Sequence, residues 1–447
     1  MKNILILSYL QKTFLSLFEF SKKLNQSKDI EVFLYTSITI YKKYYLEITK
    51  SEIQIINKND LEKQLKKRIS TKINGSLLKN VNSILSRLPI VEEKKLFINS
   101  QKKISYIEEL LLKNNIKKVL INGDRQLHKD LLFLKASKNL DIETVIPYLV
   151  YFAEEEGLLK TGKQVYNDSL YISLYNKKAQ KKFKNHLRKN KFYYSHSTAN
   201  VLDKLGILPT NPWFMGGGDS DILCLPNDNM KNHYISNGIN EDKIKVVGDI
   251  SYDLLYKSCN IKENIKNSIL KKYDMDKSKN ILMISLPQLA EHKILSWDEH
   301  WIEINFLMEN LNKLNQNILI SLHPKMNLDN YKFLEKKYNC RILEEKLINV
   351  LPISDIFIAT YSSTVLWSVL CGIKTIVVDF YNFKYVMYDF LESIVKVEDK
   401  KKLFSILNKT LINEQNFDSD WKKLSRDEVF DGKTIERYIK LLKEDKV

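Results

Sequence analysis

A histidine at the end of an apolar run has clear chemical potential in this chain. His323 follows Ile318–Leu322, a run typical of a buried strand, and stands directly before Pro324. Proline fixes its own φ and favours an extended backbone at the residue before it. A histidine at a strand end can donate a hydrogen bond or a proton to a phosphate or leaving-group oxygen. The structural alternative is a histidine bonded only to backbone.

Hydroxyl side chains follow the next apolar run. Ser362, Ser363 and Thr364 come after Ile356–Ile358, at the start of an expected helix. Free N–H groups at a helix N-terminus bind phosphate, and hydroxyls add donors. An ordinary helix cap uses the same residue types. Because these hydroxyls and the strand-end histidine belong to one domain, we predict that they bind a phosphate group together.

Polar residues that could bind a ligand also follow the first expected strand in the second half of the chain, in the turn before the next helix. Gln288, Glu291 and His292 follow an apolar run there. This turn commonly faces a nucleotide in open α/β sheets, so we predict that Gln288 and His292 bind one. Trp297 and Trp301 follow closely. We expect these two rings to pack within the protein and not to stack on a base.

Carboxylates in the first half of the chain can serve as bases. Glu154, Glu155 and Glu156 precede Gly157, and Asp124 follows a predicted strand. Adjacent acids at the edge of a cleft can take a proton from a sugar hydroxyl. A solvated turn is the alternative for the triplet. The catalytic candidates are therefore Glu155, Glu156, Asp124 and His323.

The elements that would position these residues alternate between strands and helices. In the first half the expected strands are Asn3–Ser8, Glu31–Thr36, Lys118–Asn122, Glu143–Pro147, Asp221–Leu225 and Lys245–Val247, and the expected helices are Phe14–Asn25, Leu61–Asn114 and Leu127–Asn139. The alternation continues from Ile281–Ser285 onward. This pattern predicts an α/β protein with two Rossmann-like, doubly wound parallel sheets facing a cleft. We expect domains at 1–257 and 275–425 and a C-terminal helix at 426–447.

Composition narrows the class of protein. A length of 447 residues favours two domains, and 44% hydrophobic content excludes a disordered chain. The net charge of +17 fits nucleic acid, an anionic membrane surface or a phosphorylated substrate, and equally a solvated lysine-rich surface. The basic segment 177–191 is expected to be a solvated helix face, with membrane or acidic-acceptor binding as the alternative. We expect no nucleic-acid partner.

The four cysteines and the apolar runs bear on the compartment. Cys224, Cys259, Cys340 and Cys371 form no Cys-x-x-Cys pair and have no metal-ligand spacing with histidine. A reduced protein without a metal site is the simplest interpretation. No transmembrane span or signal peptide is visible. We therefore expect a cytoplasmic protein, either free or attached peripherally to the inner face of the membrane.

Three short motifs occur in an order that resembles bacterial sialyltransferases and polysialyltransferases of the GT-B type. The motifs are Glu155-Glu156-Gly157, His323-Pro324 and Ser362-Ser363. The resemblance implies that Glu155 or Glu156 is the general base on an acceptor hydroxyl. It implies that His323 binds the nucleotide phosphate and assists its departure, while the two serines hold that phosphate. A CMP-linked, sialic-acid-like donor, a cell-surface glycan or glycolipid acceptor, and no metal or other cofactor are implied as well, as in capsule or lipo-oligosaccharide synthesis.

A second resemblance is to the non-hydrolysing UDP-N-acetylglucosamine 2-epimerases, which share the GT-B fold. It rests on Val119–Asp124, Glu154–Gly162 and Lys245–Leu255, and it implies roles for Asp124 and for Glu155 or Glu156. The family's His-Arg-Arg stretch is replaced by Pro287–His292, and its Ser-Gly-Gly loop by Ser-Ser-Thr. We interpret this likeness as shared fold and ancestry. A UDP-HexNAc epimerase-like enzyme and a non-catalytic glycan- or membrane-binding protein are the alternatives to a glycosyltransferase.

Overall fold

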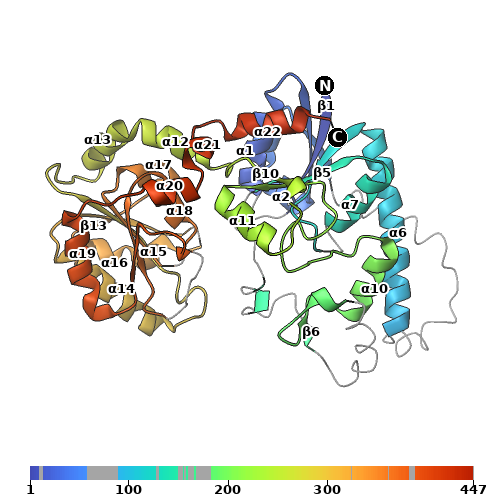
Figure 1. The fold of residues 1–447 in the computed structure, drawn as a ribbon. Helices are drawn as coiled ribbons and strands as arrows, with labels where there is room; N and C mark the ends of the chain where they lie inside the picture. The colour runs from blue at the N-terminus through green and yellow to red at the C-terminus, as the bar shows by residue number, and fades with distance from the viewer. Residues whose placement is uncertain are drawn as a thin grey trace. The chain divides into compact units, whose positions relative to one another are not determined.

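The chain forms two compact units in the computed structural model (Figure 1). The structure describes residues 1–9, 14–57, 89–126, 130–148, 155, 158–159, 166–167, 183–323, 325–360, 362–381 and 388–445. Unit 1 comprises Met1–Ile250 and Ile435–Val447, and unit 2 comprises Ser251–Thr434. The chain therefore passes from unit 1 into unit 2 and returns to unit 1 for its last helix.

Unit 1 is built on a parallel sheet of seven strands. Its spatial order is β10-β9-β5-β4-β1-β2-β3, and every adjacent pair is parallel. The strands are β1 (Lys2–Leu7), β2 (Ile30–Thr36), β3 (Gln54–Asn57), β4 (Ile116–Leu120), β5 (Glu143–Ile146), β9 (Ile222–Leu225) and β10 (Ile244–Val246). The order reverses between β1 and β4, which is the topological switch point of a doubly wound sheet.

Helices cover both faces of this sheet. They are α1 (Phe14–Asn25), α2 (Ile38–Lys43), α3 (Tyr45–Thr49), α6 (Pro89–Lys113), α7 (Asp130–Asn139), α10 (His196–Leu205), α11 (Asp228–Ser236) and α22 (Thr434–Lys443). Alternate residues of β1 serve opposite cores, since side chains alternate along a strand. Ile4 and Ile6 pack in the core with α1 and α22, whereas Leu5 and Leu7 pack in the core with α6 and α7.

Unit 2 repeats the design with six parallel strands. Its order is β13-β12-β11-β14-β15-β16, so the switch point lies between β11 and β14. The strands are β11 (Ile281–Ser285), β12 (Asn317–Ser321), β13 (Cys340–Ile342), β14 (Ile356–Ala359), β15 (Lys374–Val378) and β16 (Ile394–Val397). The helices are α12 (Tyr252–Asn260), α13 (Lys262–Lys272), α14 (Trp297–Asn312), α15 (Leu328–Tyr331), α16 (Phe333–Lys337), α17 (Leu347–Val350), α18 (Thr364–Leu370), α19 (Leu403–Ile412), α20 (Asp418–Lys423) and α21 (Arg426–Val429).

The two parallel sheets confirm the predicted α/β class, and several elements form where the periodicity placed them. Helix α1 has the predicted bounds, and α6 forms the described end of the predicted helix Leu61–Asn114, whose residues 61–88 lie outside the described part.

The expectation of a helix in the basic segment 177–191 is wrong for its described part. Residues 184–186 form a single 3-10 turn, and β7 (Leu187–Arg188) and β8 (Lys191–Phe192) form an antiparallel hairpin that also pairs β8 with β6 (Tyr166–Asn167). Lys189 and Asn190 at the hairpin tip have positive φ, which a helix does not allow. Phe183 and His186 are buried, so this part is not a wholly solvated face.

Candidate active site

Four of the predicted binding residues follow strands whose ends meet at one edge of unit 2. Gln288 and His292 follow β11, His323 follows its neighbour β12, and Ser362 follows β14 on the other side of β11. The carboxyl ends of parallel strands share one edge of the sheet, and open α/β sheets bind ligands in the crevice at their switch point. The structure therefore groups these residues where a nucleotide is expected.

His323 has a defined tautomer when it is neutral. Its Nδ1 accepts a hydrogen bond from the backbone N–H of Lys325 at 3.1 Å, so the ring proton lies on Nε2. The side chain is exposed. Partial desolvation of the ring lowers its pKa below the ordinary value, and the charges of Lys325 and His292 act in the same direction, while Glu291 opposes them. A neutral His323 can still donate from Nε2 to a ligand.

A chain of hydrogen bonds connects Glu291, which lies close to His323, with the buried His300. The hydroxyl of Tyr331 donates to Glu291 Oε1 at 2.7 Å and lies 2.9 Å from His300 Nε2. Since the tyrosine proton goes to the carboxylate, His300 donates from Nε2. Burial lowers the pKa of His300, which favours its neutral form. Burial, followed by the bond to Glu291, raises the pKa of Tyr331 far above its ordinary value.

Two buried acceptor atoms at this edge have no hydrogen-bond partner among the described residues. They are Gln288 Oε1 and Glu291 Oε2, both on the turn after β11. A buried oxygen without a donor costs free energy, so such atoms are candidates for ligand contacts. Glu291 also lies close enough to His323 to influence its pKa. This turn therefore offers acceptors for ligand hydroxyl or amino groups beside a histidine donor.

The hydroxyl loop after β14 is partly engaged in capping. Ser362 Oγ accepts from the backbone N–H of Thr364 at 3.3 Å and lies 2.7 Å from Thr364 Oγ1. The hydroxyl of the buried Tyr388 donates to the carbonyl of Ser362 and holds the loop. Ser363 is exposed and makes no side-chain cap bond. Ser363 is consequently the exposed residue among Ser362, Ser363 and Thr364. Pro324, which follows His323 in the sequence, lies outside the described residues.

The predicted bases lie in unit 1, where the structure describes only part of them. Glu155 forms an ion pair with Arg188 Nε at 3.2 Å, and each side chain is about a third exposed. Glu156 and the neighbouring Glu154 lie outside the described residues. Glu155 therefore has a carboxylate that solvent reaches and a cationic neighbour on the hairpin of β7 and β8.

Asp124 has a different environment from Glu155. Its side chain is fully buried and accepts hydrogen bonds from the backbone N–H groups of Gly216 and Gly218, at 3.0 and 2.9 Å, and from Ser220 Oγ at 3.0 Å. The glycines are required here: a Cβ at Gly217 would lie 1.9 Å from the carbonyl oxygen of Asn211. The structure thus gives Asp124 the position of an anchor for a close-packed turn.

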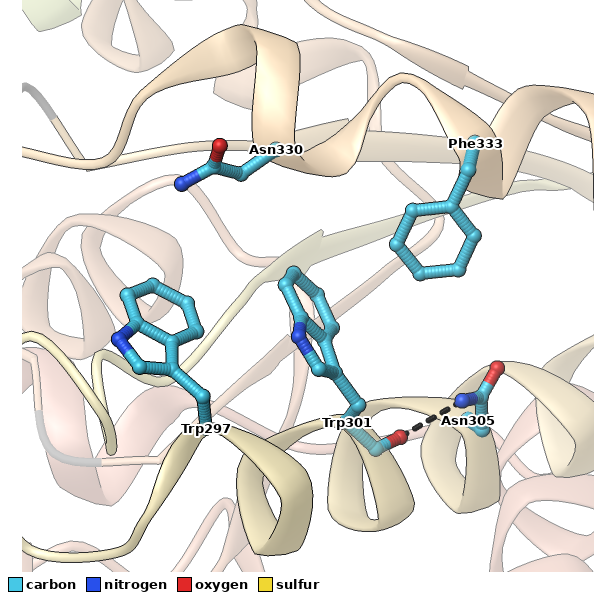
Figure 2. A pocket seen from close by; sticks show the side chains of 5 residues that line it. All are labelled: Trp297, Trp301, Asn305, Asn330 and Phe333. Carbon is cyan, nitrogen blue, oxygen red and sulfur yellow. Dashed lines mark hydrogen bonds between the residues drawn. The ribbon is translucent and has the colours of Figure 1, made fainter.

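An open pocket of about 570 Å³ lies on unit 2 between α14 and the helices after β12. Figure 2 shows Trp297 and Trp301 projecting side by side from α14 toward Asn330 and Phe333. The two indoles stack at 5.6 Å, and Trp297 is 44% exposed. Trp297 therefore packs on Trp301 and His300, as expected, while part of its ring is open to the pocket. The fifth lining residue, Asn305, is held by bonds to Trp301, Lys337 and Tyr338.

Sequence patterns did not identify three residues that organise the site. His300 and Tyr331 lie within helices as ordinary polar interruptions, and Tyr388 stands in an aromatic stretch. Their partners are 31, 40 and 26 residues away, so no local motif connects them.

Among the described residues, no group of three His, Cys, Asp or Glu side chains could hold a metal ion. No helix in the described part of the chain is long and apolar enough to cross a membrane.

Comparisons with known proteins place the fold. No protein-family model and no curated protein sequence matches this chain. It is similar to the solved structure of UDP-GlcNAc 2-epimerase from Methanocaldococcus jannaschii, with 15% identity, 99% of each chain covered and a TM-score of 0.54. UDP-GlcNAc 2-epimerase from Neisseria meningitidis bound to UDP-GlcNAc shows 12% identity, 99% and 100% coverage and a TM-score of 0.53. The calicheamicin glycosyltransferase CalG4 shows 10% identity, 99% and 97% coverage and a TM-score of 0.54. These similarities confirm the predicted GT-B-like fold and the fold-level likeness to the 2-epimerases.

Proposed function

We propose that the chain is a GT-B glycosyltransferase that moves a sugar from a nucleotide donor to a glycan or glycolipid acceptor. The observation that carries the proposal is the edge of unit 2, where His323 has a donor at Nε2 and lies close to Glu291. At the same edge, Gln288 Oε1 and Glu291 Oε2 are buried acceptors without a hydrogen-bond partner among the described residues. This set of one donor and two acceptors is complementary to a nucleotide, whose phosphate oxygens accept hydrogen bonds and whose hydroxyl and amino groups donate them. The ordered motifs described above favour a CMP-linked, sialic-acid-like donor.

In the proposed reaction, His323 and His292 lie at the phosphate, and the hydroxyl of Ser363 adds a further donor. Glu155 or Glu156 takes the proton of an acceptor hydroxyl, and the resulting oxygen attacks the anomeric carbon of the donor sugar. The bond from that carbon to the phosphate oxygen breaks, and the Nε2 proton of His323 stabilises the charge on the leaving phosphate. These residues supply the charge stabilisation that a metal ion supplies elsewhere.

The acceptor in this proposal is a saccharide, and the pocket beside Trp297 has matching chemistry. A sugar ring has an apolar face of C–H groups and a rim of hydroxyls. The indole of Trp297 offers a flat apolar surface, and the side-chain amide of Asn330, which makes no hydrogen bond within the described part of the chain, offers polar contacts. We expect Trp297→Ala to raise the KM for the acceptor while donor affinity stays unchanged. Ile302→Ala, at an exposed position on the same helix, is the matched control.

A UDP-HexNAc 2-epimerase-like enzyme is the second candidate, favoured by the fold similarity to 2-epimerases. It needs no acceptor and would turn over UDP-HexNAc alone, with Asp124 essential. Two observations oppose it: the arginines and glycines of the epimerase motifs are replaced here, and Asp124 is buried with three hydrogen bonds.

Binding of free nucleotides tests the proposal directly. The purified chain would be screened by thermal shift against CMP, CDP, UDP and GDP, together with His323→Ala and the double variant Ser362→Ala/Ser363→Ala. A ligand at about 100 times its Kd stabilises the folded state by roughly 2.7 kcal/mol, which is readily detected. His233→Ala, which removes an exposed histidine on α11, is the matched control.

The pattern of shifts decides between the candidates. Stabilisation by CMP that is lost in both site variants but kept in His233→Ala supports a CMP-sugar transferase. Stabilisation by UDP alone supports a UDP-sugar enzyme, and turnover of UDP-HexNAc without acceptor then identifies the epimerase. If no nucleotide shifts the Tm, the proposal fails.

A further inference from the structure

Two cysteines that are far apart in the sequence meet in unit 2. Cys259 lies in α12 and Cys371 is the C-cap residue of α18, 112 positions later. Their sulfur atoms are 3.1 Å apart. Both residues are partly exposed, whereas Cys224 and Cys340 are buried. The pair thus combines close contact between two sulfur atoms with partial exposure of both residues.

Backbone contacts hold Cys371 in place. The carbonyls of Val369 and Leu370, at the end of α18, accept hydrogen bonds from Trp421 Nε1 and Arg426 Nε, each at 2.7 Å. Helix α12 is held in turn, because Asp253 accepts from the backbone N–H of Thr434 at 2.7 Å. The helix carrying Cys259 and the end of the helix carrying Cys371 are therefore each fixed by contacts that do not involve sulfur.

The surroundings of the pair favour a thiolate at one sulfur. A hydrogen bond with Cys371 lowers the pKa of the Cys259 thiol, and the positive charges of Arg426 and Lys262 act in the same direction. Burial instead raises the pKa of Cys371. Cys224 and Cys340 have pKa values raised by burial to about 12, so they are far less reactive. Cys259 is thus the expected attacking sulfur.

We propose that Cys259 and Cys371 are a site of reversible oxidation, forming a disulfide that joins α12 to the end of α18. The oxidant is a low-molecular-weight disulfide such as oxidised glutathione. The Cys259 thiolate attacks one of its sulfurs, the reagent's S–S bond breaks, and one thiolate leaves and takes up a proton. Cys371, deprotonated, then attacks the Cys259 sulfur of the mixed disulfide and releases the second thiol. Two protein thiols are oxidised and one small disulfide is reduced to two thiols.

The bond would affect the unit that carries the candidate nucleotide site. It closes a loop that contains β11, β12 and β14, and it fixes the end of the helix that begins just after Ser363. Closing a long loop restricts the unfolded chain, so oxidation is expected to raise the Tm of unit 2 by roughly 5 °C or more. This inference does not depend on which nucleotide the site binds.

The test uses the full-length chain equilibrated in oxidised or reduced glutathione. Thiols are then blocked with N-ethylmaleimide under denaturing conditions, and intact mass and digested peptides are analysed. In the oxidised wild-type chain, only two of the four cysteines should react with N-ethylmaleimide, and the mass should be lower by the two hydrogen atoms lost on oxidation. Digestion should yield a cross-linked peptide that contains Cys259 and Cys371. Dithiothreitol should reverse the change and the rise in Tm.

Matched variants make the outcome decisive. Cys259→Ser and Cys371→Ser should each abolish the cross-link and the rise in Tm, and Cys371→Ser should accumulate a glutathione adduct at Cys259. Cys224→Ser and Cys340→Ser should leave the cross-link intact. Four alkylated cysteines, or a stable glutathione adduct without a cross-link in the wild-type chain, would overturn the proposal.

Discussion

Asp124 Oδ2 accepts a hydrogen bond from the backbone N–H of Gly218 at 2.9 Å, which ties together two loops 94 residues apart. The same carboxylate also binds the N–H of Gly216 and the hydroxyl of Ser220. Gly216 has a φ of +81°, and a Cβ at Gly218 would lie 2.7 Å from the carbonyl oxygen of Asp124. A strand-end acid of unit 1 therefore has a structural position that its sequence context does not reveal.

Replacing Asp124 with alanine is expected to destabilise the protein strongly. Two N–H groups and one hydroxyl would lose their acceptor at a buried site, which should cost roughly 3 kcal/mol or more in the free energy of unfolding. Urea denaturation measures this change. Asp219→Ala, which removes a neighbouring surface acid paired with Lys138, should change it by less than about 1 kcal/mol. A variant of normal stability that is inactive would instead indicate a catalytic role for Asp124.

Local sequence patterns predicted where strands form better than they predicted which loops come into contact. The runs that form β11 and β14 are apolar because both faces of the sheet are covered, and that signal is local. The meeting of Gln288, His323 and Ser362 at one edge follows from strand order, which a parallel sheet makes predictable. Pairs such as Cys259 and Cys371 depend on how helices pack, and periodicity contains no information about that.

Nucleotide binding should couple to protonation of His323. Its pKa is lowered in the free protein, so the ring is largely neutral near pH 7. A bound phosphate favours the charged ring and raises this pKa, so binding should take up a proton and strengthen as the pH falls toward the pKa of His323 in the free protein. Calorimetry in two buffers of different ionisation enthalpy measures the uptake. His323→Asn should reduce it, and equal uptake in the variant would contradict the assignment.

Buried histidines should make the protein sensitive to mild acid. Burial lowers the pKa of His186 and of His300 in the folded state. Below the ordinary value of about 6.5, the unfolded chain takes up these protons before the folded chain does. Stability is therefore full above that pH and falls as the pH drops toward the folded-state pKa values. The Tm measured from pH 7.5 to 5 should decline, with a shallower slope in His186→Gln; an unchanged slope would exclude His186 as a cause.

Removing the hydroxyl of Tyr331 should disconnect the chain behind the candidate site. Tyr331→Phe leaves Glu291 Oε1 and His300 Nε2 without their shared partner and should cost roughly 1–3 kcal/mol. Tyr338→Phe, on the same unit, removes a hydroxyl that contacts the partly exposed Asn305 and should cost less. Urea denaturation and nucleotide affinity would be measured together. If Tyr331→Phe matches the control in both, the hydrogen-bond chain does not support the site.

Unit 1 should not fold without the last helix of the chain. Ile435, Tyr438, Leu441 and Leu442 are buried in its core, and the hydroxyl of Tyr438 accepts from the backbone N–H of Tyr148 at 3.0 Å. Burying an apolar side chain contributes about 1.5–3 kcal/mol, so removing four approaches the whole stability of a typical domain.

The measurement is thermal unfolding of a chain that ends at Thr434, with circular dichroism as the signal. Unit 2, which ends at that residue, should still unfold cooperatively, whereas the signal from unit 1 should be lost or the chain should aggregate. Lys443→Ala, which removes the surface pair with Asp29, should leave both transitions within about 1 kcal/mol of the wild-type chain. Because α22 packs against α1, a synthetic peptide of residues 435–447 should restore the unfolding transition of unit 1 in the truncated chain. If the truncated chain keeps this transition without the peptide, the last helix is dispensable.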